Sequence, residues 1–141
     1  MSYTAERVGM ALLALPFIVH AQIIGAQTIG MQTIVANGTW GGTGLRVEVS
    51  STGADVEFDC AHGRIEGTIH LGKTGSFDVK GTFAPEHGGP ILRDEDAAAY
   101  AARYKGRVAG DTMTVTVLQG TTKIGPFRIK RGARPILRKC R

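Results

Sequence analysis

The segment Leu45–Cys60, with the sequence LRVEVSSTGADVEFDC, decides the fold class of this chain. Apolar and polar side chains alternate in it on both sides of a Ser-Ser-Thr-Gly run, which is typical of two half-buried β-strands joined by a turn. A two-residue turn at Thr52-Gly53 would place apolar residues opposite apolar residues. The predicted pairs are Val49 with Val56, Val47 with Phe58 and Leu45 with Cys60.

The alternation continues in short runs after Cys60. Turns at His62-Gly63, at Lys73-Thr74-Gly75 and at Gly110-Asp111 each give apolar cross-strand pairs. These pairs are Cys60 with Ile65, Phe58 with Gly67 and Val56 with Ile69; Leu71 with Phe77 and Ile69 with Val79; and Val108 with Met113 and Tyr104 with Val117. Gly125-Pro126 interrupts the last run and predicts a bulge or an edge position.

Four turns with consistent pairing predict an all-β fold, an antiparallel meander. Edges this apolar need closure, so we expect a small β-barrel of about seven or eight short strands. The stretch after Phe83 differs, because Ala84–Pro90 has loop composition and Asp94–Ala102 begins with acidic residues and is followed by Arg103. That order suits a helix dipole and predicts one short helix within a long loop, which could be functional or a passive plug.

Residues 1–21 predict a secretory signal peptide. Arg7 is the positive residue, Val8–Val19 is the apolar region, and small residues precede a cleavage site before Gln22. A retained signal anchor is the alternative, since Ile23 and Ile24 prolong the apolar character. Residues 22–37 would be a linker or a loosely attached first strand, and residues 38–141 a single barrel domain, with no membrane span left after cleavage.

Two cysteines, Cys60 and Cys140, agree with export to the periplasm or the medium. A disulfide between them would close a loop of about 80 residues and contribute roughly 4 kcal/mol to stability. A metal site at Cys60 and His62 is the weaker interpretation because two ligands are too few.

The charge is divided unevenly along the chain. Residues 22–102 carry 5 basic and 10 acidic side chains, whereas residues 103–141 carry 11 basic and 1 acidic. A surface built from the last third would attract phosphates, acidic glycans or anionic lipid head groups, or would be a solvated basic face. The residues singled out for it are Arg131, Arg134, Arg138 and Lys139. Nucleic acid is not expected as a partner, because no aromatic residues are interleaved with these charges.

Catalytic motifs are absent from the sequence, and we predict neither an enzyme nor a cofactor. The predicted pairing puts two sets of outward side chains in rows: Asp55, His70 and Asp78, and Arg46, Asp59 and Glu66. Each row could be a metal or acid–base site, but a surface ion-pair cluster is the better interpretation. The loop and ligand candidates are Trp40, Glu86, His87 and Tyr100.

Gly38-Thr39-Trp40 at the start of the β region resembles the Gly-x-Trp motif of the lipocalin and calycin barrels. Arg128 or Arg131 stands where that family has an Arg over the Trp, and the tail disulfide is also similar. The resemblance implies a barrel around a ligand site, although the predicted inward residues could equally fill it. These residues are Val47, Phe58, Ile69, Val79, Val115 and Phe127.

The sequence therefore predicts an exported, non-enzymatic binding module, whose partner is a small apolar ligand or another protein. The alternative is an envelope-associated structural or interaction protein that uses its basic C-terminal surface on acidic polymers.

Overall fold

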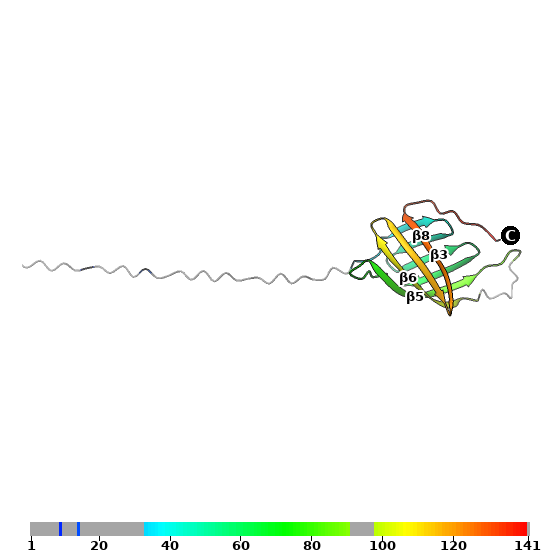
Figure 1. Ribbon diagram of the computed structural model, residues 1–141, viewed down its shortest axis with the longest axis horizontal. Helices are drawn as coiled ribbons and strands as arrows, with labels where there is room; N and C mark the ends of the chain where they lie inside the picture. Colours follow the sequence, from blue (N-terminus) through cyan, green and yellow to red (C-terminus); the bar gives the residue numbers. More distant parts are fainter. Residues whose placement is uncertain (1–8, 10–13, 15–32, 91–97, 141) are drawn as a thin grey trace, which may run out of the picture.

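The computed structural model describes residues 9, 14, 33–90 and 98–140 of the chain. Within them, eight antiparallel strands follow one another around a closed barrel (Figure 1). The strands are β1 (Gly38–Gly42), β2 (Leu45–Ser50), β3 (Gly53–Phe58), β4 (Ala61–Glu66), β5 (Ser76–Pro85), β6 (Tyr100–Ala109), β7 (Thr112–Gln119) and β8 (Thr122–Arg131). The predicted all-β meander barrel is confirmed.

The barrel has two distinct ends. The turns at 43–44, 59–60 and 120–121 lie at one end, which we call the disulfide end. The turns at 51–52 and 110–111 lie at the opposite end. There the segment 33–37 packs beside the loop after β4, since the Val35 amide donates to the Ile69 carbonyl (3.0 Å) and the Leu71 amide to the Thr33 carbonyl (2.7 Å).

The barrel interior is occupied by its own side chains. The largest fully buried ones are Trp40, Tyr104, Leu45, Met113, Ile129, Val56 and Val117. Glycines at inward positions leave room for the rings: a β-carbon on Gly81 would lie 2.7 Å from Tyr104 Cε2, and one on Gly106 would lie 2.6 Å from Phe77 Cζ. A narrow barrel is filled when large inward side chains face small inward residues.

The predicted inward positions face the core in the structure. Val47, Phe58, Ile69 and Val115 are buried, and Val79 and Phe127 are partly buried against the same core cluster. Phe58 also packs edge-to-face on Phe83, with ring centroids 5.2 Å apart. The inward set of side chains is therefore confirmed, even where the pairing partners differ.

The first predicted turn is wrong by two residues in register. Ser50 pairs with Gly53, so the turn residues are Ser51 and Thr52, and Val47 faces Val56 instead of Phe58. Gly53 lies within the strand, where a β-carbon would collide with the Ile65 carbonyl of β4. A shift of two residues keeps every side chain on its predicted face.

The second predicted turn, at His62-Gly63, is also wrong. Phe58 pairs with Ala61, so the turn is Asp59-Cys60, and Val56 faces Gly63 instead of Ile69. Cys60 adopts the left-handed backbone (φ 55°) at the second position of this turn. Gly63 points inward, where a β-carbon would collide with the Tyr104 hydroxyl.

The remaining hairpins give a mixed result. The predicted pairs of Leu71 with Phe77 and of Ile69 with Val79 are wrong, because β4 ends at Glu66 and leaves Ile69 and Leu71 outside the strand pairs. The turn at Gly110-Asp111 is confirmed, with Val108 opposite Met113 and Tyr104 opposite Val117. The predicted bulge is confirmed as well, because the β7–β8 register shifts between Val115 and Val117, beside Gly125-Pro126.

The predicted helix over Asp94–Ala102 is not seen. Its last residues, Tyr100–Ala102, begin β6, where Ala102 is buried opposite Gly81. The rest of the predicted helix, up to residue 97, lies outside the described residues. Cross-strand pairing with β5 takes the place of the local helical preference of an alanine run.

Candidate functional site

The outer face of β2–β4 carries carboxylates that are paired within the face. Arg46 contacts Glu48 (3.1 Å) and Glu57 (3.4 Å). Arg64 contacts Asp55 (2.6 Å) and Glu66 (2.9 Å), and these two carboxylates raise the Arg64 pKa. Each carboxylate of these three strands therefore has an arginine partner.

The two predicted rows of outward residues are both wrong in membership. Asp55 lies opposite Arg64 rather than beside His70. His70 forms a β-bridge with Ile34 at the end of the barrel that lies opposite the disulfide end. Asp78 faces Lys105. In the second row, Arg46 lies opposite Glu57, while Asp59 sits in a turn. The cause is the shifted turn positions. Surface ion pairs form as predicted, but Arg46, Asp55 and Glu66 have partners other than those in the predicted rows.

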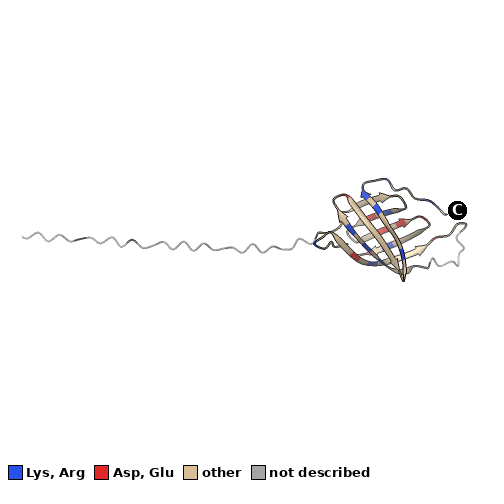
Figure 2. Cartoon of the chain, in the orientation of Figure 1, with Lys and Arg blue, Asp and Glu red and all other residues tan. Residues whose placement is uncertain are grey.

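The outer face of β5–β8 is strongly cationic. Its basic residues are Lys80, Arg103, Lys105, Arg107, Lys123, Arg128 and Lys130. Asp78 is the carboxylate of this face, and it contacts Arg103 (2.9 Å) and Lys105 (3.7 Å). Figure 2 shows lysine and arginine spaced along β6 and β8.

The other cations of this face have no carboxylate partner among the residues that the structure describes. They are Lys80, Arg107, Lys123, Arg128 and Lys130. Arg107 donates from Nε to the Thr74 carbonyl (2.9 Å), which holds the guanidinium in place without neutralising it. The barrel thus has one self-paired charged face and one face with uncompensated positive charge.

A stripe of hydroxyls divides the cationic face. Thr112, Thr114 and Thr116 are outward residues of β7, followed on the same face by Leu118, and β7 lies between β6 and β8. Thr114 lies opposite both Arg107 and Arg128, so one transverse row reads Arg–Thr–Arg. Neighbouring strands are about 4.8 Å apart, so the β6 and β8 backbones flank a lane about 10 Å wide.

Trp40, a ligand candidate from the sequence, lies inside the barrel. It is 1% exposed, and its Nε1 donates to the Ala36 carbonyl (3.0 Å). Arg131 is its cross-strand neighbour on β8 and donates to the Asn37 carbonyl (3.2 Å). Together they join β1 to β8 and close the barrel at the end where the 33–37 segment enters.

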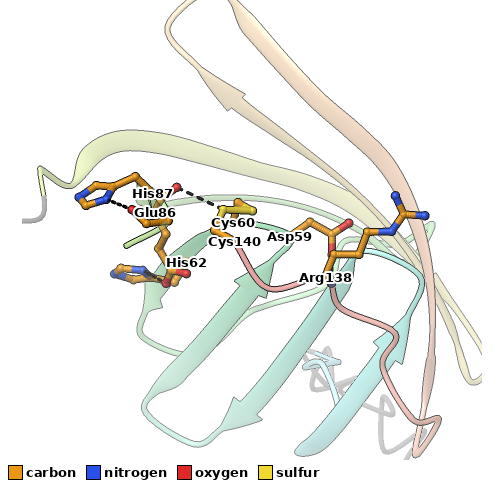
Figure 3. The surroundings of a disulfide bond; sticks show 8 residues. Asp59, Cys60, His62, Glu86, His87, Arg138 and Cys140 are labelled. Atoms are coloured by element: carbon orange, nitrogen blue, oxygen red, sulfur yellow. Dashed lines mark hydrogen bonds and ion pairs between the residues drawn. A yellow bond between two sulfur atoms is a disulfide. The ribbon is translucent and has the colours of Figure 1, made fainter. Parts of the chain in front are cut away.

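The predicted disulfide between Cys60 and Cys140 is present and ties the C-terminal tail to the turn between β3 and β4 (Figure 3). The Arg138 amide donates to Asp59 Oδ1 (2.6 Å), and the Glu86 amide donates to the Cys60 carbonyl (2.8 Å). The bond is compatible with an oxidising, exported location.

The loop candidates lie near this disulfide end but do not form one site. Glu86 Oε1 lies 2.7 Å from His62 Nδ1, and both side chains are about half exposed. Figure 3 shows this pair beside the disulfide. The ring of His87 lies 2.8 Å from the Gly88 carbonyl, and Tyr100 is 48% exposed at the start of β6. A cavity of about 320 Å³ runs past His62 and Glu86 to the tail at Leu137–Lys139.

The tail cations singled out from the sequence are exposed, but they lie apart from the sheet face. Arg134, Arg138 and Lys139 follow the last strand, and the tail crosses over Gly41 and the turn after β1. Sequence reasoning did not single out the cationic face. A signal for it exists, because Arg103, Lys105 and Arg107 alternate at outward positions of one run.

Two further findings concern the described residues only. They contain no group of three or more His, Cys, Asp or Glu residues placed to hold a metal ion. They also contain no helix with the length and apolar character needed to cross a membrane.

Comparison of the chain with protein-family models, with curated proteins and with solved structures gave no match.

Proposed function

We propose that this protein is an exported, non-enzymatic binding module whose cationic face on β5–β8 binds an acidic polysaccharide. The observation that supports the proposal is the asymmetry of ion pairing. Four carboxylates on the β2–β4 face share Arg46 and Arg64, which leaves that face net negative, whereas five cations on the other face have no carboxylate partner in the described part of the chain. Uncompensated charge on one side attracts polyanions.

The chemistry of the face favours a sugar polymer over other polyanions. Threonine hydroxyls on β7 can hydrogen-bond to sugar hydroxyls, while the flanking guanidinium and ammonium groups contact carboxylates. Single-stranded nucleic acid would need several aromatic stacking residues, and Tyr100, at the start of β6, is the one exposed aromatic side chain of the described β5–β8 strands. A membrane-inserting surface would need several exposed large apolar side chains, whereas the outward positions of β5–β8 hold one, the partly exposed Leu118.

A small apolar ligand inside the barrel has less support. Trp40, Tyr104 and the other large buried side chains occupy the interior, and glycines stand at positions where a β-carbon would collide with the rings. The resemblance to lipocalins, carried by Trp40 and Arg131, therefore supports a barrel without supporting a lumen.

The proposal is tested by measuring the affinity for polygalacturonate at low and at moderate salt. A triple variant, Arg107→Gln with Arg128→Gln and Lys130→Gln, should bind roughly tenfold more weakly, since each exposed contact contributes up to about 1 kcal/mol. The matched control removes the same number of charges from the tail, by Arg134→Gln, Arg138→Gln and Lys139→Gln. It should bind as the wild type does.

Equal losses in both triple variants would show a response to net charge and overturn the assignment to this face. Binding to anionic phospholipid vesicles or to DNA, without binding to polygalacturonate, would overturn the polysaccharide assignment. Methyl-esterified pectin, which lacks the carboxylate charge, should bind far more weakly than polygalacturonate.

A further inference from the structure

A shallow hollow of about 430 Å³ lies on the outer face where β5, β6 and β7 approach the disulfide end. Its lining residues are Lys80, Gly81, Ala101, Ala102, Arg103, Leu118 and Gly120. It therefore combines two cations with small or apolar residues. The hydroxyl stripe of β7 runs toward it, since Leu118 is the next outward residue after Thr116.

The two cations of the hollow differ in how firmly their side chains are held. Lys80 and Arg103 are directly opposite each other on β5 and β6. Arg103 is held by Asp78, which accepts from its Nε (3.0 Å) and contacts its terminal nitrogen (2.9 Å). Lys80 has no carboxylate partner among the described residues. The hollow thus offers one fixed guanidinium and one ammonium free to meet an incoming anion.

The floor of the hollow suits a flat, partly apolar body. Gly81, Ala101, Ala102 and Gly120 have little or no side chain, and Leu118 adds an apolar wall. Pyranose rings have an apolar face formed by their C–H groups, and such a face packs on small apolar surfaces while ring hydroxyls stay in water. A long acyl chain would need a deep channel instead, because most of its surface must be buried.

We infer that this hollow is a subsite for a single uronic acid unit. The carboxylate lies between Lys80 and Arg103, and the ring lies against Ala101 and Leu118. This inference rests on the proposed function and deepens it: the cationic face holds the polymer by charge, and the hollow distinguishes a carboxylated sugar from other anionic groups.

The test is a titration of the isotope-labelled protein with sodium glucuronate, followed by amide resonances in two-dimensional NMR. Glucuronate should shift the amides of Ala101, Arg103, Leu118 and Gly120. Glucose, which has the ring without the carboxylate, and acetate, which has the carboxylate without the ring, should shift them far less at the same concentration.

Lys80→Gln should weaken glucuronate binding about fivefold, which corresponds to the loss of one exposed charge contact. Lys139→Gln is the matched control, because it removes an exposed ammonium of the tail, outside both the cationic face and the hollow. It should leave glucuronate binding unchanged. Leu118→Ser should weaken glucuronate binding without changing the response to acetate.

Acetate shifts as large as those of glucuronate would overturn the subsite, as would decanoate binding in the absence of glucuronate binding. If polygalacturonate binds the cationic face but glucuronate leaves the hollow unperturbed, the subsite is wrong and the proposed function stands. If glucuronate binds and polygalacturonate does not, the proposed function fails by itself.

Discussion

Gly81 faces the ring of Tyr104 inside the barrel, and this contact can be tested directly. A β-carbon at Gly81 would lie 2.7 Å from Tyr104 Cε2, so any side chain must displace the ring or the strand. We expect Gly81→Val to lower the free energy of unfolding by about 3 kcal/mol, the upper part of the range for overpacked cores. Urea denaturation measures this change.

Gly72→Ala is the control for that substitution. Nothing lies closer than 3.5 Å to a β-carbon at Gly72, so the variant should stay within about 0.5 kcal/mol of the wild type. A Gly81→Val protein as stable as Gly72→Ala would contradict the account of a barrel filled by rings and glycines.

Tyr104 predicts a loss of stability in alkali. Its hydroxyl donates to the Thr82 carbonyl (2.6 Å), and burial raises its pKa above the ordinary value. In the unfolded chain the phenol ionises near pH 10. Above that pH the unfolded state has lost a proton that the folded state keeps, so the free energy of unfolding falls as pH rises.

Tyr104→Phe removes this titration. The variant should be about 1 kcal/mol less stable at neutral pH, because it loses a hydrogen bond. Its stability should then fall less steeply than that of the wild type above pH 10, as followed by urea denaturation across the pH range. Parallel pH profiles for the two proteins would show that Tyr104 ionises normally in the folded state.

At the scale of strands and turns, the sequence predicts whether a side chain points into the barrel better than it predicts which residue lies opposite on the next strand. Alternation determines which residues point inward, and errors of two or six residues in register preserve it. The turn positions were harder to predict, because a glycine can mark a turn or can leave space for a large side chain inside the barrel. His62-Gly63 resembles a turn, yet Gly63 makes space for Tyr104, and Cys60 adopts the left-handed backbone in its place. The contact between Gly63 and Tyr104 joins residues more than 40 positions apart in the chain, so local sequence does not reveal it.

The hollow could not be predicted from the sequence, and the alternation of Arg103, Lys105 and Arg107 indicated only one strand of the cationic face. Lys80 and Arg103 are separated by a long loop, and only the β5–β6 register brings them together. The basic C-terminal third was visible in composition, whereas the division of its charges between a sheet face and a tail was not. The alanine run before Arg103 favoured a helix locally, and pairing with β5 overrode that preference.

The tail is the element whose position depends on a covalent bond. Replacing both cysteines, by Cys60→Ser with Cys140→Ser, should lower the free energy of unfolding by about 2–5 kcal/mol. The Ile136 and Arg138 amides, bonded to the Gly42 carbonyl (3.0 Å) and to Asp59 (2.6 Å), should then exchange with solvent much faster. Hydrogen exchange measures this change. Unchanged protection of both amides would show that the tail is held without the disulfide.

At the scale of the whole molecule, the inward residues determine how the barrel closes, and the outward residues determine its surface charge. The barrel closes through the β1–β8 pairs at Trp40 and Gly41, and each strand contributes an inward apolar face. That leaves the outward residues free to differ between the two sides. A polyanion would therefore meet positive charge on the β5–β8 side and net negative charge on the β2–β4 side, where four carboxylates share two arginines.

The Cys60–Cys140 bond also divides the barrel mechanically. If the molecule is pulled from the 33–37 segment and from the end of the tail, force passes from Cys140 directly to Cys60, and β4–β8 lie within a covalent loop that bears no load. Only the chain from residue 33 to Cys60 can be drawn out, which is roughly 90 Å of extended length.

With the disulfide reduced, the same pull should release the whole barrel, roughly 350 Å from residue 33 to Cys140. Single-molecule force spectroscopy of the oxidised and reduced protein should show these two contour lengths. The longer extension in the oxidised protein would contradict this account. The disulfide thus limits the extension of the chain. The strands β5–β8, which carry the cationic face, bear no load while β1–β3 are under tension.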